Sequence, residues 1–191
     1  GALSVTQKSR LIRELSIASE ARGTDATGIA YNTSRGLQIY KRPLAAYRLH
    51  LRIPAEAHVV MGHTRMTTQG SAKKNFNNHP FLGHVKGESF ALAHNGVVWN
   101  DLELRHAKHL PRTKVQTDSY IAVQLIERQN ALNLSSLKCM AEQVEGSFSF
   151  SVLSERDDLY LIKGDNPLTI AYFPKVGVYV YASTAEILNK A

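Results

Sequence analysis

Two apolar segments in the middle of the chain, each followed directly by polar residues, constrain the fold more than any other feature of the sequence. Residues 57–63 and 89–93 have the length and composition of β-strands. The first leads into a polar run that contains Arg65, and the second leads into Asn95 and Gly96. We expect each strand to end in a polar turn, so that side chains and backbone N–H groups from both turns surround one small ligand.

The residue types at these two turns suit a ligand with a carboxylate and a reacting carbonyl. An arginine such as Arg65 can hold a carboxylate through two parallel hydrogen bonds. Asn95 and Gly96 offer a side-chain amide and a backbone N–H one residue apart, which is the donor pair of an oxyanion hole. Each piece also has a structural interpretation, since Asn-Gly is common in hairpin turns and a lone arginine in surface ion pairs. The histidines of this stretch are typical of satisfied interior residues: His63, His79 and His94.

The rest of the pattern predicts an α+β domain. Helices are predicted over residues 9–21, 43–50, 101–109, 117–129, 134–144 and 184–190, with Thr117 or Asp118 as the cap of the fourth. Strands are predicted over residues 27–32, 37–41, 147–153, 159–163, 168–173 and 176–182, and residues 1–5 are interpreted as the end of a strand. The last four strands are expected to form an antiparallel meander. Strands at both ends with helices between them favour two sheets with helices outside, and we expect residues 1–191 to form a single domain.

Composition and charge exclude several classes of protein. No apolar run approaches the roughly 20 residues that span a bilayer and no signal peptide is evident, so we expect a cytoplasmic protein. The single cysteine, Cys139, rules out an internal disulfide and is predicted to be buried in a helix. The net charge of +7 is scattered along the chain, so nucleic acid is not an expected partner. No cofactor or metal is expected, because His106 and His109 have no acidic or cysteine companion.

Seven short motifs follow one another with regular spacing over almost the whole chain. In chain order they are Arg22-Gly23-Thr24-Asp25-Ala26-Thr27-Gly28, Gly62-His63-Thr64-Arg65 with Thr68 and Gly70, Asn77-Asn78-His79-Pro80, His94-Asn95-Gly96 with Asn100, Thr117-Asp118, Glu145-Gly146-Ser147-Phe148, and Lys163-Gly164-Asp165-Asn166-Pro167-Leu168. Together they resemble the glutaminase domain of the class II glutamine amidotransferases, which are N-terminal-nucleophile hydrolases. The form of the motifs is closest to the glutamine–fructose-6-phosphate amidotransferase branch.

The resemblance implies a four-layer αββα sandwich and the cleavage of the glutamine side-chain amide to glutamate, with the ammonia passed to an acceptor. It implies that Arg65 holds the α-carboxylate of L-glutamine, with the Thr68 hydroxyl beside it, and that Asp118 holds the α-ammonium. Asn95 and Gly96 are implied to stabilise the tetrahedral oxyanion. Three further residues are implied to shape the pocket without reacting: Arg22, Gln69 and His79.

The sequence departs from the family pattern at its start. The nucleophile of the family is an N-terminal cysteine whose α-amine acts as the base. In the family this cysteine is followed by Gly, a hydrophobic pair and another Gly. Gly1-Ala2-Leu3 aligns with the residues just after that opening, so the nucleophile is expected four residues before Gly1. Cys139 has no N-terminal amine beside it and is not expected to replace it. Met66 and Gln69 also differ from the residues usual at their positions, which bears on affinity and loop closure more than on reaction type.

Three functions remain open from the sequence. The first is an active glutaminase domain whose cysteine lies ahead of Gly1, and the second is a module that binds glutamine or a related amino acid without cleaving it. The third is an N-terminal-nucleophile hydrolase that acts on a different amide. No acceptor region is recognisable, so the acceptor is expected on a separate subunit or in a longer chain, unless the protein is a stand-alone glutaminase. An oligomer is possible.

Overall fold

The alternation of large and small apolar side chains along β5 (Glu88–Val98) determines how the layers of the protein pack. Phe90 and Leu92 point to one face of the strand, where they join the largest buried cluster. Ala91 and Ala93 point to the other face, where they meet the second sheet. Because these alanines are small, the two sheets can approach closely on that side, while the large side chains fill the space beneath the outer helices.

Two β-sheets stack on each other, and every strand pair in the described residues is antiparallel. The strand orders are β2-β1-β3 and β4-β5-β6-β7, and a separate hairpin is formed by β8 and β9. The bounds of these strands are β1 Ala26–Thr33, β2 Gly36–Arg42, β3 Val60–Arg65, β4 Phe81–Val85, β6 Gly146–Ser154, β7 Leu159–Lys163, β8 Thr169–Phe173 and β9 Val178–Ala182.

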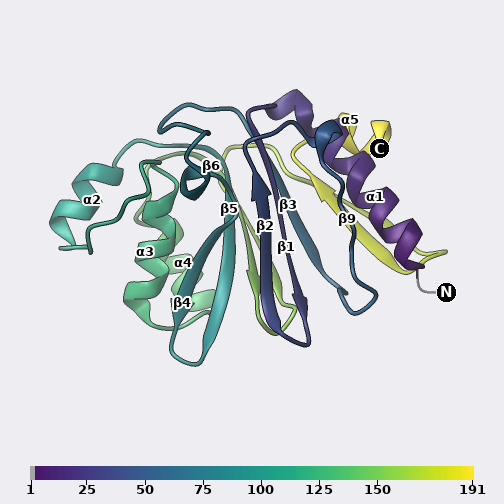
Figure 1. Ribbon diagram of the computed structural model, residues 1–191. Helices are drawn as coiled ribbons and strands as arrows, with labels where there is room; N and C mark the ends of the chain where they lie inside the picture. The colour runs from purple at the N-terminus through teal and green to yellow at the C-terminus, as the bar shows by residue number, and fades with distance from the viewer. Residues whose placement is uncertain (1–2) are drawn as a thin grey trace.

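The helices cover both outer faces of the sheets in the computed structural model, which describes residues 3–191. Figure 1 shows α2, α3 and α4 on the side of β4 and β5, and α1 and α5 on the opposite side. Their bounds are α1 Val5–Ala18, α2 Asp101–Ala107, α3 Tyr120–Gln129, α4 Leu134–Ala141 and α5 Ala185–Lys190. The predicted four-layer αββα order is therefore confirmed. Over residues 3–191, none of the helices has the length and apolar character needed to cross a membrane.

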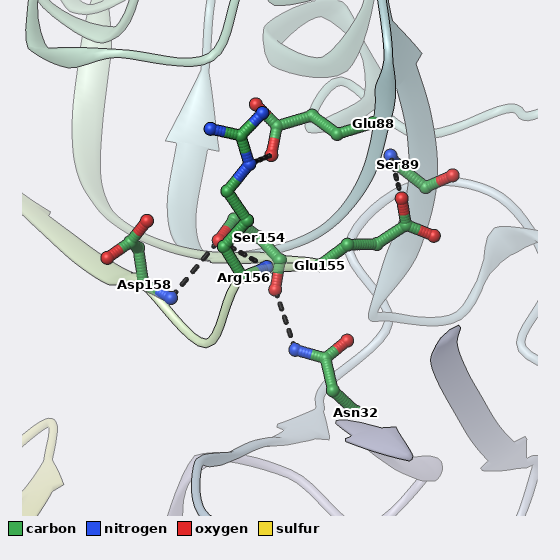
Figure 2. Close-up of polar contacts among 7 residues, drawn as sticks. All are labelled: Asn32, Glu88, Ser89, Ser154, Glu155, Arg156 and Asp158. Carbon is green, nitrogen blue, oxygen red and sulfur yellow. Dashed lines mark hydrogen bonds and ion pairs between the residues drawn. The ribbon is translucent and has the colours of Figure 1, made fainter. Parts of the chain in front are cut away.

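A set of polar contacts joins the two sheets at the end where β5 begins (Figure 2). The Asn32 side chain, at the end of β1, donates a hydrogen bond of 2.8 Å to the backbone carbonyl of Ser154. The next residue, Glu155, accepts a hydrogen bond of 2.8 Å from the backbone N–H of Ser89. These contacts fix the turn between β6 and β7 against both sheets. The other end of β5 carries Asn95, which lines a cavity.

Several predicted elements differ from the structure. Residues 1–2 lie outside the described part of the chain, and Leu3 is not in a strand, because Ser4 caps α1 through a reciprocal pair of hydrogen bonds with Gln7. The helix predicted over residues 43–50 is only the short 3₁₀ turn Ala46–Arg48. β4 was not predicted at all.

Two further corrections concern the neighbourhood of the candidate site. Asn95 and Gly96 do not form a turn, because they lie inside β5, where they pair with Ser149 and Phe148 of β6. The C-terminal strands do not form one meander, because β7 pairs with β6 while β8 pairs only with β9 in the described residues. The Asn166 side chain donates to the Asn95 carbonyl at 2.7 Å, so the segment between β7 and β8 crosses the end of the sheet.

Candidate active site

Arg65 is the last residue of β3 and is almost completely buried, with 4% of its surface exposed. Its Nη1 donates to Asn78 Oδ1 at 2.7 Å and its Nη2 donates to the carbonyl of Gln69 at 2.5 Å. Burial lowers the pKa of Arg65, whereas the negative charges of Asp25 and Asp118 raise it. A guanidinium group has five N–H donors and stays charged in proteins, so it retains donors for a carboxylate ligand.

Asp118 lies just before α3 and is also buried. Its Oδ2 accepts a hydrogen bond of 2.6 Å from the backbone N–H of Val98. The prediction that Thr117 or Asp118 caps this helix is therefore wrong, since the N-cap residue is Ser119 and the Asp118 carboxylate is turned toward β5. Burial raises the pKa of Asp118, and the hydrogen bond from Val98 opposes this shift. A cationic ligand would favour its ionised form.

Asn95 and Gly96 present a donor and a close backbone approach at the same point of β5. The Asn95 Nδ2 atom is buried and has no hydrogen-bond partner within residues 3–191. Gly96 has φ of +137°, and a Cβ atom there would lie 1.8 Å from the carbonyl oxygen of Ser147. Only glycine fits this position. The unpartnered amide is a donor that a ligand can satisfy.

These residues line a single cavity of about 180 Å³. The cavity brings together all eight residues that the sequence singled out for the site: Arg22, Arg65, Thr68, Gln69, His79, Asn95, Gly96 and Asp118. Thr68 and Gln69 are exposed at its rim, whereas Arg65 and Asp118 are buried. It therefore contains a buried cation and a buried carboxylate, the two groups that the charged ends of an amino acid require.

Three histidines, His63, His79 and His94, also line this cavity. Burial lowers the pKa of His63 and of His94 to about 4, and that of His79 well below its usual range. All three rings are therefore neutral near pH 7. His63 Nε2 lies 2.9 Å from the carbonyl oxygen of His94, so Nε2 carries the proton and donates it. No group of three or more His, Cys, Asp or Glu side chains in the described residues could hold a metal ion.

A larger groove of about 570 Å³ continues from the cavity and runs between β3 and β9 beneath α1. Within the described residues β3 pairs only with β1 and β9 only with β8, so each strand has one unpaired edge. Six buried polar atoms of the groove lining also make no hydrogen bond to residues 3–191: Arg22 Nε, His63 Nδ1, His94 Nε2, Asn95 Nδ2, the Tyr181 hydroxyl and Ser183 Oγ. Buried polar atoms are nearly always paired, so this groove has the character of an incomplete interior.

Cys139 lies away from these cavities on α4. It is half-buried rather than buried as predicted, and the side-chain amides of Gln129 and Gln143 contact its sulfur at 3.3 Å. Sequence reasoning did not assign Asn78 a function, although it directly precedes His79 in one of the motifs. Its side chain holds the Arg65 guanidinium.

Comparison with known proteins gives the family. The chain matches the glutamine amidotransferase domain family over residues 63–190, which is 128 of its 191 residues (190 − 63 + 1). The chain belongs to this family. Two sequence relatives indicate the branch. One is the glutamine–fructose-6-phosphate aminotransferase (isomerizing) of Halalkalibacterium halodurans, 31% identical over 175 residues. The other is the Lactococcus lactis protein of the same name, 34% identical over 161 residues.

These alignments cover 87% and 79% of this glutamine amidotransferase chain but only 28% and 26% of the two relatives. The chain therefore spans little more than a quarter of their length. Two solved structures share its fold. Glutamine phosphoribosylpyrophosphate amidotransferase from B. subtilis has a TM-score of 0.75 at 21% identity, and an allosteric regulatory enzyme of purine biosynthesis has a TM-score of 0.76 at 22% identity. Each match covers 94% of this chain and 40% of the other. The predicted resemblance to class II glutamine amidotransferases and the N-terminal-nucleophile fold are confirmed.

Proposed function

We propose that this amidotransferase domain hydrolyses the side-chain amide of L-glutamine to glutamate and ammonia. The observation that carries the proposal is the cavity in which buried Arg65 and buried Asp118 accompany the unpartnered amide of Asn95. Arg65 would hold the α-carboxylate, with Thr68 adding a hydroxyl, and Asp118 would hold the α-ammonium. This pairing of one cation with one anion selects an amide that carries an α-carboxylate and an α-ammonium over amides that lack them.

Asn95 and Gly96 are proposed to stabilise the oxyanion that forms at the amide carbon. In related sites the loss of one such donor costs about 2.7–4 kcal/mol of transition-state stabilisation. The free Asn95 Nδ2 supports this role, because a preorganised donor need not break another hydrogen bond when the charge develops. Arg22, Gln69 and His79 are proposed to shape the cavity wall.

The nucleophile is proposed to be a cysteine four residues before Gly1. The terminal amine would take the thiol proton, and the thiolate would attack the amide carbon. The amine would pass that proton to the departing ammonia, and water would then release glutamate from the thioester. The groove supports this location. Six residue steps lead from Leu3 back to that position, two to Gly1 and four more, which is about 20 Å in extended form.

A stretch of the groove wall has a comparable length. Leu3 lines the groove, and along its wall six residue steps lead from His58 to Thr64, which is about 20 Å for an extended chain. Thr64, Asn95 and Arg22 line both the groove and the small cavity. An extended segment that fills the groove would offer backbone partners to the unpaired polar atoms and would bring its first residue to the cavity.

The ammonia is proposed to pass to an acceptor bound by another domain or subunit. The relatives support this, because their name includes fructose 6-phosphate and this chain spans only about a quarter of their length.

The test uses the chain extended by Cys-Gly-Val-Val ahead of Gly1 and a control extended by Ser-Gly-Val-Val. Glutamate should form from glutamine with the first protein and not with the second. Arg65→Ala in the cysteine-extended chain should abolish glutamate formation. Glutamine binding without turnover in the cysteine form would instead indicate a binding module. Equal turnover of amides that lack the amino-acid group would contradict the roles of Arg65 and Asp118.

A further inference from the structure

Lys41 of β2 is a half-buried lysine that makes no ion pair within residues 3–191. Its Nζ donates to the backbone carbonyls of Asn78 and Pro80, at 2.5 and 2.9 Å, and lies 5.2 Å from the centre of the Phe81 ring. Two carbonyls and an aromatic face thus replace the carboxylate that usually accompanies such a cation. Removing a cation from water is costly, so its position requires an explanation.

The segment that Lys41 holds, residues 78–80, carries the side chain that orients Arg65. Asn78 is fully buried, and its Oδ1 accepts the hydrogen bond of 2.7 Å from Arg65 Nη1. Its Nδ2 donates to the carbonyl of Ala72 at 2.8 Å, so both ends of the amide are occupied. The backbone of Asn78 is therefore bonded to Lys41 while its side chain is bonded to Arg65.

The segment also has little room to move toward β1. Gly28 of β1 is the partner of Lys41 in the sheet, and a Cβ atom on Gly28 would lie 2.2 Å from the carbonyl oxygen of His79. The backbone of the segment is thus in direct contact with β1, and the Lys41 ammonium group binds the carbonyls on either side of that contact.

We propose that Lys41 is a positioning residue for the candidate site: it fixes the carbonyls of Asn78 and Pro80, and Asn78 in turn fixes the Arg65 guanidinium for a substrate carboxylate. Lys41 does not itself line the cavity. The inference rests on the proposed function, because it assumes that Arg65 binds the α-carboxylate of glutamine.

The charge state of Lys41 adds a signature in pH. Burial, together with the positive charge of Arg65, lowers the pKa of Lys41 to about 8. The groups that face it are Arg65 from β3 and the neutral ring of His79 in the held segment. A neutral amine loses the charge that makes its hydrogen bonds to carbonyls strong. Affinity for glutamine should therefore fall between pH 7 and pH 9 more than the titration of glutamine itself explains.

The experiment measures glutamine binding by calorimetry to the Ser-Gly-Val-Val-extended chain, in which no turnover is expected, and to its Lys41→Met, Lys41→Arg and Lys8→Met variants. Lys8 is the matched control, because its Nζ also donates to two backbone carbonyls, those of Ala55 and Ala57, at 2.8 and 3.1 Å. Kd should rise about tenfold in Lys41→Met, a change of about 1.4 kcal/mol. It should stay within about threefold in the other two variants.

The pH series separates positioning from a general loss of structure. Lys41→Arg stays charged throughout, so its affinity should fall less than that of the unsubstituted chain between pH 7 and pH 9. An unchanged Kd in Lys41→Met, or the same decline with pH in the unsubstituted chain and Lys41→Arg, would overturn the inference while leaving the proposed function intact. Failure of the folded, Ser-Gly-Val-Val-extended chain with Lys41 intact to bind glutamine would overturn both.

Discussion

Gly96→Ala tests the geometry of β5 at the candidate site. A Cβ atom at this position would lie 1.8 Å from the carbonyl oxygen of Ser147 and 2.6 Å from the Asn166 side chain. Since real Cβ contacts do not fall below 3.0 Å, the backbone of β6 must withdraw by at least 1.2 Å (3.0 − 1.8). The φ of +137° adds strain of about 1–3 kcal/mol for a residue with a side chain.

The withdrawal of β6 would weaken one or two ladder hydrogen bonds at about 1 kcal/mol each. Together with the strain, the expected loss is about 3 kcal/mol in the free energy of unfolding. For a domain of this size that corresponds to a fall of about 6–12 °C in Tm. In the cysteine-extended chain, kcat should also fall about 10²- to 10³-fold if the Gly96 N–H stabilises the oxyanion.

Thermal unfolding by circular dichroism measures the effect, with Gly62→Ala as the matched control. Gly62 lies in β3 of the facing sheet, and the nearest atom to its Cβ position is 3.8 Å away, so the change should cost less than about 1 kcal/mol. Equal losses in the two variants, or a fall of less than about 2 °C in Gly96→Ala, would refute the reasoning.

Three further predictions concern charge, capping and acid stability. Asp118→Asn keeps an oxygen for the Val98 N–H but removes the anion, so KM for glutamine should rise about 30-fold, or about 2 kcal/mol, with little change in stability. Ser4→Ala removes the capping box of α1 and should cost about 1 kcal/mol in urea unfolding; no loss would show that this helix end contributes nothing. His63 and His94 have pKa values of about 4 in the folded protein, below the unfolded value of about 6.5, so the unfolded chain binds more protons. Stability should therefore be greatest above pH 6.5 and fall toward pH 4, and a fall that is equally steep in His63→Gln would contradict this assignment.

Local pattern was enough to predict most elements and to single out Arg65, Asn95 and Gly96, whereas the other five cavity residues were implied by the family resemblance. The strands over residues 27–32 and 37–41 are confirmed, because alternating apolar residues and turn residues act over a few positions. The four-layer order, which is also confirmed, was implied by the family resemblance and not by local pattern. The eight site residues meet in one cavity because each lies in or beside a short polar motif next to a predicted strand or helix. The roles assigned to them stay predictions.

The errors arose where a distant partner determines the local structure. Asn95-Gly96 has the composition of a turn, but β6 pairs with these residues and keeps them in a strand. Asp118 has the composition of a helix cap, but the N–H of Val98 binds its carboxylate. Lys41 lies 37 residues from Asn78 in the sequence, and no local pattern links the two.

The close approach of the two sheets affects the dimensions of the cavity at their edge. Arg65 belongs to one sheet and Asn95 to the other, so the separation of the sheets sets how far apart these two groups stand. That separation depends on the smallest side chains of the interior, notably Ala91 and Ala93, which are fully or almost fully buried. One or two additional methyl groups there should hold the sheets farther apart and so increase the distance between Arg65 and Asn95, without altering any residue that lines the small cavity.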